Sequence, residues 1–244
     1  GGPVARRMEV WEYCAPQIDV FAPDIYVPDF PGVCDAYTKR GNPLFIPECA
    51  THSYAGVREV YAVGHYHAMC YSPFGFEDIG KPFNAQQGAL FGMDVSDPAL
   101  KTPQNVEEYY WFTHNLQEMM PLLAGKYGTA DLQAVSVERK EENEMVFGSF
   151  GFRVILEHAR IKDNRGVCLV LKETEDTFYV MVHAAGLAFF TTDEKKANVD
   201  ILVLEEGRFR DGVWTAGRRF NGDEVSGMIY EEPTMLKVKL FAYE

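Results

Sequence analysis

The chain changes its pattern near residue 128, and this change limits the folds that it can adopt. Before that point, short apolar segments alternate with segments of helical periodicity. The apolar segments 18–26, 43–48 and 67–74 have the length of buried strands. Strands that are joined through helices run parallel. Residues 1–128 are therefore predicted to form an α/β domain around a parallel sheet.

Residues 129–244 are predicted to form short strands separated by tight turns, with one long strand over 145–158. The turns are rich in Asn, Asp and Gly, which favour the left-handed backbone of β-hairpins. They are Asp163-Asn164-Arg165-Gly166, Glu206-Gly207, Asp211-Gly212 and Asn221-Gly222-Asp223. We expect an all-β domain over residues 129–244, built as a β-sandwich.

Composition excludes several classes of partner. The 244 residues carry a formal net charge of -13 with a pI near 4.9, and 47% of them are hydrophobic, which is ample for a packed core. Nucleic acid and anionic membranes carry phosphate and would repel such a surface, so neither is expected as a partner. No apolar run approaches the roughly 20 residues of a membrane helix. The five cysteines are scattered without a CxxC pair, which argues against a zinc ribbon or a disulfide framework.

The segment Asn42–Glu48 is the most informative for function. It is an apolar strand that stops at Pro47 and then presents the carboxylate of Glu48. In barrels of eight parallel strands, catalytic residues lie at the carboxyl ends of the strands. A retaining glycosidase uses a carboxylate as its nucleophile. Glu48 is therefore a candidate catalytic residue.

Several ordered motifs in the first 80 residues carry a family resemblance. They are Gly1-Gly2-Pro3, Ala15-Pro16-Gln17-Ile18-Asp19, Ala22-Pro23-Asp24-Ile25-Tyr26, Asn42–Glu48 and Ser72-Pro73-Phe74-Gly75-Phe76-Glu77-Asp78. Together they resemble the C-terminal part of the catalytic barrel of family 35 glycoside hydrolases, the β-galactosidases, in the bacterial branch with a further β domain. The resemblance implies strands six to eight of a (β/α)8 TIM barrel over residues 1–128. It also implies an exo-acting enzyme on terminal β-D-galactosides, with Glu48 as the retaining nucleophile and Tyr26 beside it at the barrel mouth.

The resemblance also predicts what this chain lacks. The acid/base glutamate of the family follows the fourth strand, and nothing in this sequence matches it. Three strands cannot close a barrel. We therefore expect this chain to be one piece of a larger enzyme, completed by a second chain or within the same polypeptide, and inactive by itself. No metal or organic cofactor is implied, because two carboxylates suffice for the chemistry. The family favours a periplasmic or secreted location, while the cytoplasm stays open.

Further residues are candidates for contact with the substrate. A phenol hydrogen bond from Tyr26 would help to hold Glu48 charged. His52 follows Glu48 by four positions, near the expected rim of the barrel. A platform for a sugar face and an acceptor for its hydroxyls are expected after the third strand, where Ser72, Phe74 and Glu77 are the candidates. A structural role is the alternative for each of them.

Other interpretations stay open beside this one. Asp24 is expected to be structural, because it lies within a strand, and Cys49 is expected to be a buried thiol. The pair in His65-Tyr66-His67, with His52, could bind a metal in a metal-dependent hydrolase. The main alternative is a non-catalytic carbohydrate-binding or accessory protein. Aromatic residues of the β domain that are expected in its core could then stack on sugars instead: Phe178, Tyr179, Phe189, Phe190 and Trp214.

Overall fold

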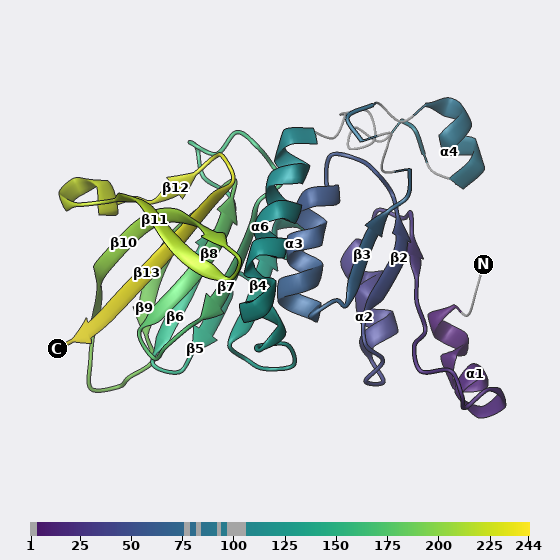
Figure 1. Cartoon of the computed structure of the whole chain (residues 1–244), viewed down its shortest axis with the longest axis horizontal. Helices are drawn as coiled ribbons and strands as arrows, with labels where there is room; N and C mark the ends of the chain where they lie inside the picture. The colour runs from purple at the N-terminus through teal and green to yellow at the C-terminus, as the bar shows by residue number, and fades with distance from the viewer. Residues whose placement is uncertain (1–3, 76–78, 82–83, 92–93, 97–105) are drawn as a thin grey trace. The chain divides into compact units, whose positions relative to one another are not determined.

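The chain divides into two compact units, Gly1–Tyr110 and Trp111–Glu244 (Figure 1). The computed structural model describes residues 4–75, 79–81, 84–91, 94–96 and 106–244. The first unit mixes helices with a sheet and the second is built mainly from antiparallel strands, so the predicted combination of α/β and β structure is confirmed. The units divide within the long helix α6 (Val106–Ala124), whereas the predicted boundary lay at 128/129, after this helix. No helix among the described residues is long and apolar enough to cross a membrane.

The first unit is organised around a parallel sheet of three strands in the order β1-β2-β3. Its strands are β1 (Asp24–Ile25), β2 (Phe45–Cys49) and β3 (Cys70–Pro73). Helix α2 (Phe30–Thr38) connects β1 to β2, and helix α3 (Ala55–Tyr66) connects β2 to β3. Both strand pairs are parallel, as the alternation of strands and helices predicts.

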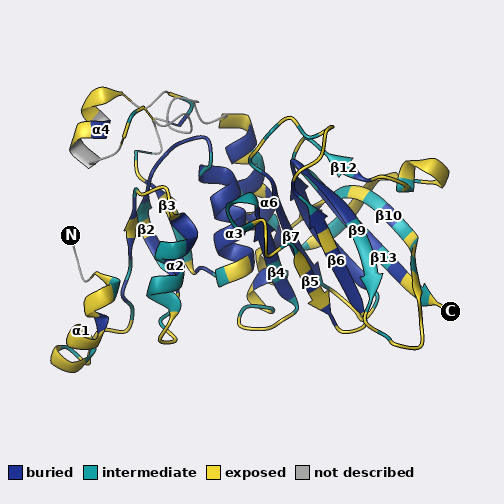
Figure 2. Cartoon of the chain, turned by 180° about the vertical axis from the view of Figure 1, so that it is seen from behind, coloured by how far each residue is buried: buried dark blue, intermediate teal, exposed yellow. Residues whose placement is uncertain are grey.

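Local chemistry explains where these helices begin and end. Helix α2 follows Asp29, whose carboxylate accepts a hydrogen bond from the Gly32 amide at 3.0 Å and so caps the helix. Helix α3 ends where His67 adopts a left-handed backbone with φ of 54°. All residues from Ala55 to Gly64 are buried, which identifies α3 as an internal helix (Figure 2). The unit also contains the short helices η1 (Ala5–Arg7), α1 (Met8–Cys14) and α4 (Ala85–Phe91).

Only the end of the predicted strand 18–26 pairs with the sheet, at Asp24 and Ile25. The side chain of Asn42 explains the difference. Its Oδ1 accepts from the Phe21 amide at 2.8 Å, and its Nδ2 donates to the Phe21 carbonyl at 2.9 Å. The side-chain amide thus satisfies backbone groups that a neighbouring strand would otherwise pair, and Pro23 has no N–H to offer. The predicted strand was therefore too long.

The second unit consists of two antiparallel sheets. Their orders are β11-β10-β13-β8-β7-β4 and β12-β9-β6-β5 (Figure 1). The strands are β4 (Leu132–Ser136), β5 (Glu144–Phe147), β6 (Phe150–Ile155), β7 (Val167–Lys172), β8 (Thr177–His183), β9 (Ala185–Thr191), β10 (Asn198–Arg210), β11 (Val213–Arg219), β12 (Ile229–Tyr230) and β13 (Thr234–Tyr243). Short 3-10 turns lie at Val137–Arg139 and Gly222–Val225.

Both sheets contribute to one apolar core, which is the arrangement of a β-sandwich. Phe152 of β6 and Phe178 of β8 come from different sheets, and their ring centroids lie 5.0 Å apart. The predicted single strand over 145–158 is instead the hairpin of β5 and β6. Its turn is Gly148-Ser149, where Gly148 has a φ of +63° that few other residues adopt readily.

Candidate active site at the carboxyl end of the parallel sheet

The parallel sheet brings Tyr26 and Glu48 together. Glu48 lies near the carboxyl end of β2 and is partly exposed, and Tyr26 directly follows β1. The Tyr26 hydroxyl donates to Glu48 Oε1 at 2.5 Å. The two residues are 22 positions apart in the chain, and the parallel pairing of β1 with β2 places them side by side. Tyr26 therefore lies beside Glu48 in the fold, as the family resemblance implied.

The Tyr26 hydroxyl keeps its proton at this position and so remains a hydrogen-bond donor. Burial raises its pKa above the ordinary value of 10.0, and its hydrogen bond to the negative Glu48 raises that pKa further. The phenol therefore stays protonated across the physiological range. A protonated phenol stabilises an ionised carboxylate and restricts its orientation. The arrangement provides a partly exposed carboxylate whose Oε1 accepts a hydrogen bond from the residue that follows the neighbouring strand.

Asp24 lies closer to this site than its position inside a strand suggested. It pairs in register with Glu48, and residues two apart on one strand share a face, so Asp24 and Tyr26 point to the same side. Partial burial and the nearby charge of Glu48 raise the pKa of Asp24. Asp24 is thus a second carboxylate on the face that carries the candidate nucleophile. The spacing of two residues between Asp24 and Tyr26 already indicated a shared face, although a structural role was expected for Asp24.

His52 is buried in a network below the strand ends. Its Nδ1 lies 3.1 Å from the Tyr54 amide, and its Nε2 lies 3.1 Å from Arg58 Nη1. Both neighbours are hydrogen-bond donors, so a protonated ring would find no acceptor in either. Burial, and then the positive charge of Arg58, lower the pKa of His52 to about 3. His52 is a neutral and enclosed residue, and these contacts favour a structural role over its predicted contact with substrate.

The segment after the third strand is only partly described. Ser72 is exposed on β3, and Phe74 is 52% exposed, with its amide donating to the Cys49 carbonyl at 2.8 Å. That hydrogen bond holds Phe74 next to the end of β2. Glu77, the third candidate here, lies outside the described residues. Ser72 and Phe74 are accessible, as a contact with substrate requires.

The alternative chemistries find little support in the geometry. Burial raises the pKa of the Cys49 thiol to about 12, which keeps it protonated and unsuited to nucleophilic attack. His65 lies in the last turn of α3, with its ring 4.8 Å from that of Tyr61, and His67 caps the same helix. Among the described residues, His52, His65 and His67 do not converge on one point as metal ligands would.

The aromatic candidates of the second unit are used in packing. Phe178 and Tyr179 are buried. A Cβ built on Gly151 would meet the Phe190 ring at 2.1 Å, and one on Gly207 would meet the Trp214 ring at 2.6 Å. Each of these rings therefore covers a glycine on the neighbouring strand, an arrangement that stabilises sheets at glycine positions.

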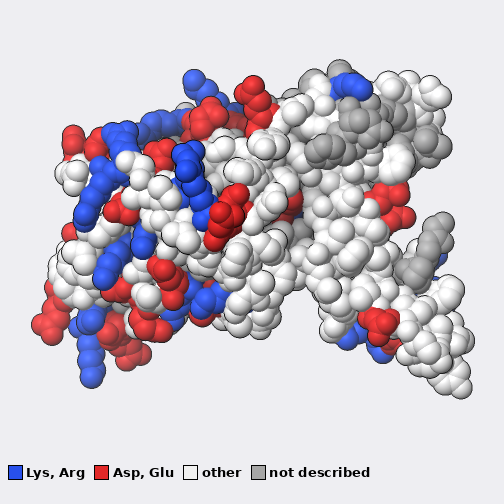
Figure 3. Space-filling model, viewed as in Figure 1, with Lys and Arg blue, Asp and Glu red and all other residues white. Residues whose placement is uncertain are grey.

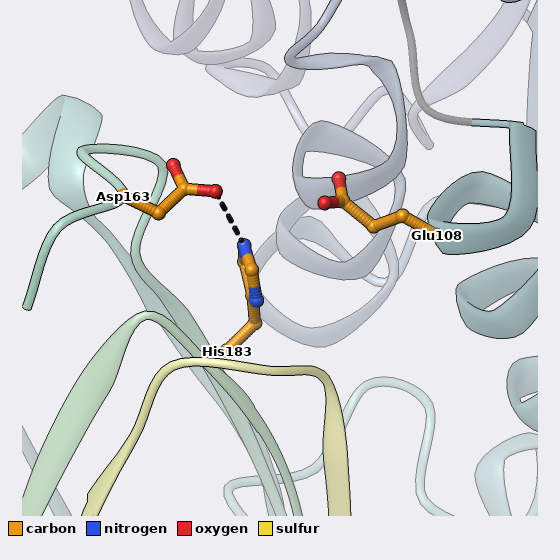
Figure 4. Close-up of side chains that lie close together, drawn as sticks. All are labelled: Glu108, Asp163 and His183. Atoms are coloured by element: carbon orange, nitrogen blue, oxygen red, sulfur yellow. Dashed lines mark hydrogen bonds and ion pairs between the residues drawn. The ribbon is translucent and has the colours of Figure 1, made fainter.

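A polar cluster in the second unit was missed from the sequence. The Asp163 carboxylate accepts from His183 Nε2 at 3.2 Å (Figure 4). It also accepts from Arg165, whose Nε lies 2.9 Å from Oδ1. Burial alone would raise the pKa of Asp163, but the hydrogen bonds from His183 and Arg165 outweigh it and hold this pKa well below the ordinary value. His183 is 20 residues away in the chain, and no local pattern links it to the turn that contains Asp163.

Charged side chains are unevenly distributed on the visible face in Figure 3. They gather over the second unit, where both signs are interspersed, while the visible face of the first unit is largely uncharged. A mixed pattern of this kind is typical of a solvated surface.

Comparison with known families gives one match. Residues 114–230 are similar to a family described as a domain of unknown function (DUF5597). The matched segment lies within the second unit and leaves out the Tyr26–Glu48 pair. A search of curated proteins found no match to the chain.

Proposed function

We propose that this chain supplies the nucleophile of a retaining β-galactosidase, with Glu48 as the attacking carboxylate. The observation that carries the proposal is the 2.5 Å contact between the Tyr26 hydroxyl and Glu48 Oε1. It lies at the carboxyl ends of two adjacent parallel strands, where barrel enzymes have their active sites. The choice of galactoside as substrate rests on the resemblance of the first 80 residues to family 35.

The two side chains have separate roles in this mechanism. Glu48 attacks the anomeric carbon and forms a glycosyl-enzyme, while a second carboxylic acid protonates the leaving oxygen. Water then releases the sugar, with the second residue acting as base. Tyr26 keeps Glu48 ionised for the first step and holds its free oxygen toward the substrate.

The second carboxylic acid must lie about 5 to 5.5 Å from the nucleophile in a retaining enzyme. In this proposal it comes from the strands that complete the barrel, on a second chain or elsewhere in the same polypeptide. The three parallel strands then correspond to the sixth, seventh and eighth strands of an eight-stranded barrel. Its neutral substrate is compatible with a protein whose net charge is -13.

Glu48→Gln tests the assignment in the complete enzyme. The amide retains the shape of the side chain but is a poor nucleophile, so kcat for an aryl β-galactoside should fall by about 10³-fold or more. A 2-deoxy-2-fluoro galactoside should also label Glu48 in the unaltered protein, as shown by the mass of the corresponding peptide. Glu9→Gln, which alters an exposed carboxylate paired with Arg40, is the matched control and should leave kcat unchanged. Near-normal turnover by Glu48→Gln would exclude Glu48 as the nucleophile.

A further inference from the structure

We propose that Arg58 is a positioning residue for the Tyr26–Glu48 pair, acting through the two loops that leave the strands of that pair. The inference rests on the proposed function for its effect on hydrolysis. Arg58 contacts residues that follow Tyr26 and Glu48 in the chain. It lies in the first turn of α3 and is 7% exposed.

One set of contacts joins Arg58 to the loop after β1. Its Nη2 donates to the Pro28 carbonyl at 2.8 Å. Pro28 is two residues beyond Tyr26, and the guanidinium also lies over the Phe30 ring at 5.0 Å. A charged donor hydrogen-bonded to a carbonyl and stacked on an aromatic ring fixes that segment more firmly than either contact alone.

A second set of contacts joins Arg58 to the loop after β2. Its Nη1 lies 3.1 Å from His52 Nε2, and His52 is four residues beyond Glu48. The Tyr54 amide already donates to Nδ1, so the approach of Arg58 to Nε2 is a close contact with the neutral ring rather than a second hydrogen bond to it. The guanidinium carbon also lies 5.7 Å from the centroid of the Tyr54 ring. Arg58 therefore bridges the loops of both strands with one rigid group.

The geometry of arginine is required for this bridge. The guanidinium is planar and presents several donors in a fixed fork, and it stacks on aromatic rings. Lysine carries the same charge, but its compact ammonium cannot reproduce both the fork and the stacking. A hydrogen bond from the Ala50 amide to the Ile25 carbonyl, at 3.1 Å, already links the ends of β1 and β2. Arg58 extends this linkage into the loops.

Loosening the bridge should affect orientation more than binding. A displacement of about 1 Å at a reacting group can cost about 10²-fold in rate. Arg58→Lys and Arg58→Ala in the complete enzyme should each lower kcat by about 10- to 100-fold. KM should change far less, because Arg58 is buried and offers a substrate little surface.

Free guanidinium provides a rescue test that a general loss of stability would not pass. Arg58→Ala leaves a space between Phe30 and Tyr54, and guanidinium added well below unfolding concentrations should restore part of the lost kcat. Arg58→Lys fills that space and should show no rescue. Arg40→Ala removes an exposed arginine that pairs with Glu9 and Glu12, and is the matched control. It should show normal kcat and no response to guanidinium.

A measurement independent of hydrolysis separates this inference from the proposed function. In protein labelled with 13C at tyrosine Cζ, the Tyr26 resonance is assigned through Tyr26→Phe. It should shift in both Arg58 variants and return in Arg58→Ala when guanidinium is added. An unshifted resonance with normal kcat would overturn the positioning role, and if Arg58→Ala does not fold, Arg58→Lys decides by the same two readouts. Normal hydrolysis by Glu48→Gln would instead refute the nucleophile and leave the Tyr26 readout intact.

Discussion

At the scale of single residues, the proposed chemistry depends on the contact between Tyr26 and Glu48. Glu48 and Tyr26 each end an apolar strand, which marked them as residues at a strand's carboxyl end. Arg58 carries no comparable mark, because a lone arginine in a helix is usually exposed. Its burial depends on His52, Pro28 and two aromatic rings that only the folded chain brings around it.

Asp163 allows a prediction about pH at the same scale. Its folded-state pKa lies below the ordinary value of 3.8, because His183 and Arg165 stabilise the charged form against burial. A lowered acid pKa contributes stability above the unfolded-state value, and this contribution is lost as the pH falls toward the folded-state value. Asp163→Asn should therefore lower the free energy of unfolding by roughly 1 to 3 kcal/mol at neutral pH. The deficit should shrink as the pH falls below about 4.

Urea unfolding of both proteins, followed between about pH 7 and pH 3, measures this difference. Asp193→Asn is a suitable control, because Asp193 lies in a loop and its contact with Lys196 is a weak ion pair at 3.9 Å. It should change stability little at either pH. A deficit for Asp163→Asn that is independent of pH would show that the charge of Asp163 is not what stabilises the cluster.

At the scale of secondary-structure elements, periodicity located most helices and strands but not all of their lengths. Strand β7 occupies the predicted residues 167–172, because its apolar run is buried between two neighbouring strands. The predicted strands 18–26 and 145–158 were too long. In the first, the Asn42 side chain replaces a strand partner, and in the second, Gly148 turns the chain back on itself. In both cases, the length of the strand depends on a single residue that the strand-like pattern of the sequence does not reveal.

The prediction at this scale concerns the role of strand β13 in the fold of the second unit. It lies between β10 and β8 in the larger sheet, and Leu236, Val238 and Leu240 point from it into the core. The segment similar to DUF5597 ends at residue 230 and so leaves out this central strand. A chain shortened to end at residue 230 should lose its cooperative fold, because both neighbouring strands lose their ladder partner and the core loses three side chains that each contribute about 2 to 5 kcal/mol.

Near-ultraviolet circular dichroism and urea unfolding would detect this loss, since they report fixed aromatic packing and cooperativity. The matched control is removal of Tyr243 and Glu244 alone, which are both exposed at the end of β13. It should retain the cooperative transition. A cooperatively folded chain that ends at residue 230 would show that β13 is not required for this unit.

At the scale of the whole molecule, the parallel sheet raises the question of how the candidate site is completed. Three strands cannot close a barrel, and the proposed mechanism needs a carboxylic acid on a further strand. A barrel of about 250 residues would require roughly 140 residues beyond the 110 of the first unit. The active protein purified from its source should therefore contain that much more chain, covalently continuous or as a companion.

Intact mass and denaturing electrophoresis of the active fraction would measure this directly. Hydrolysis of an aryl β-galactoside should coincide with the larger species through size-exclusion chromatography. The 27.6 kDa chain alone should show none. Activity from that chain alone would contradict the proposed origin of the acid.

The sequence by itself determined the alternation of strands and helices in the first unit, the change to antiparallel structure, and the strand-end carboxylate, because each is encoded in local periodicity, turn residues or a short motif. The tertiary structure decided which groups share a site. The register of β1 with β2 brings Tyr26 next to Glu48 and places Asp24 beside them. Burial keeps His52 neutral, and Arg58 links the loops that follow the two strands. These properties arise from contacts between residues distant in the chain, where hydrogen bonding and desolvation act only after the chain has folded.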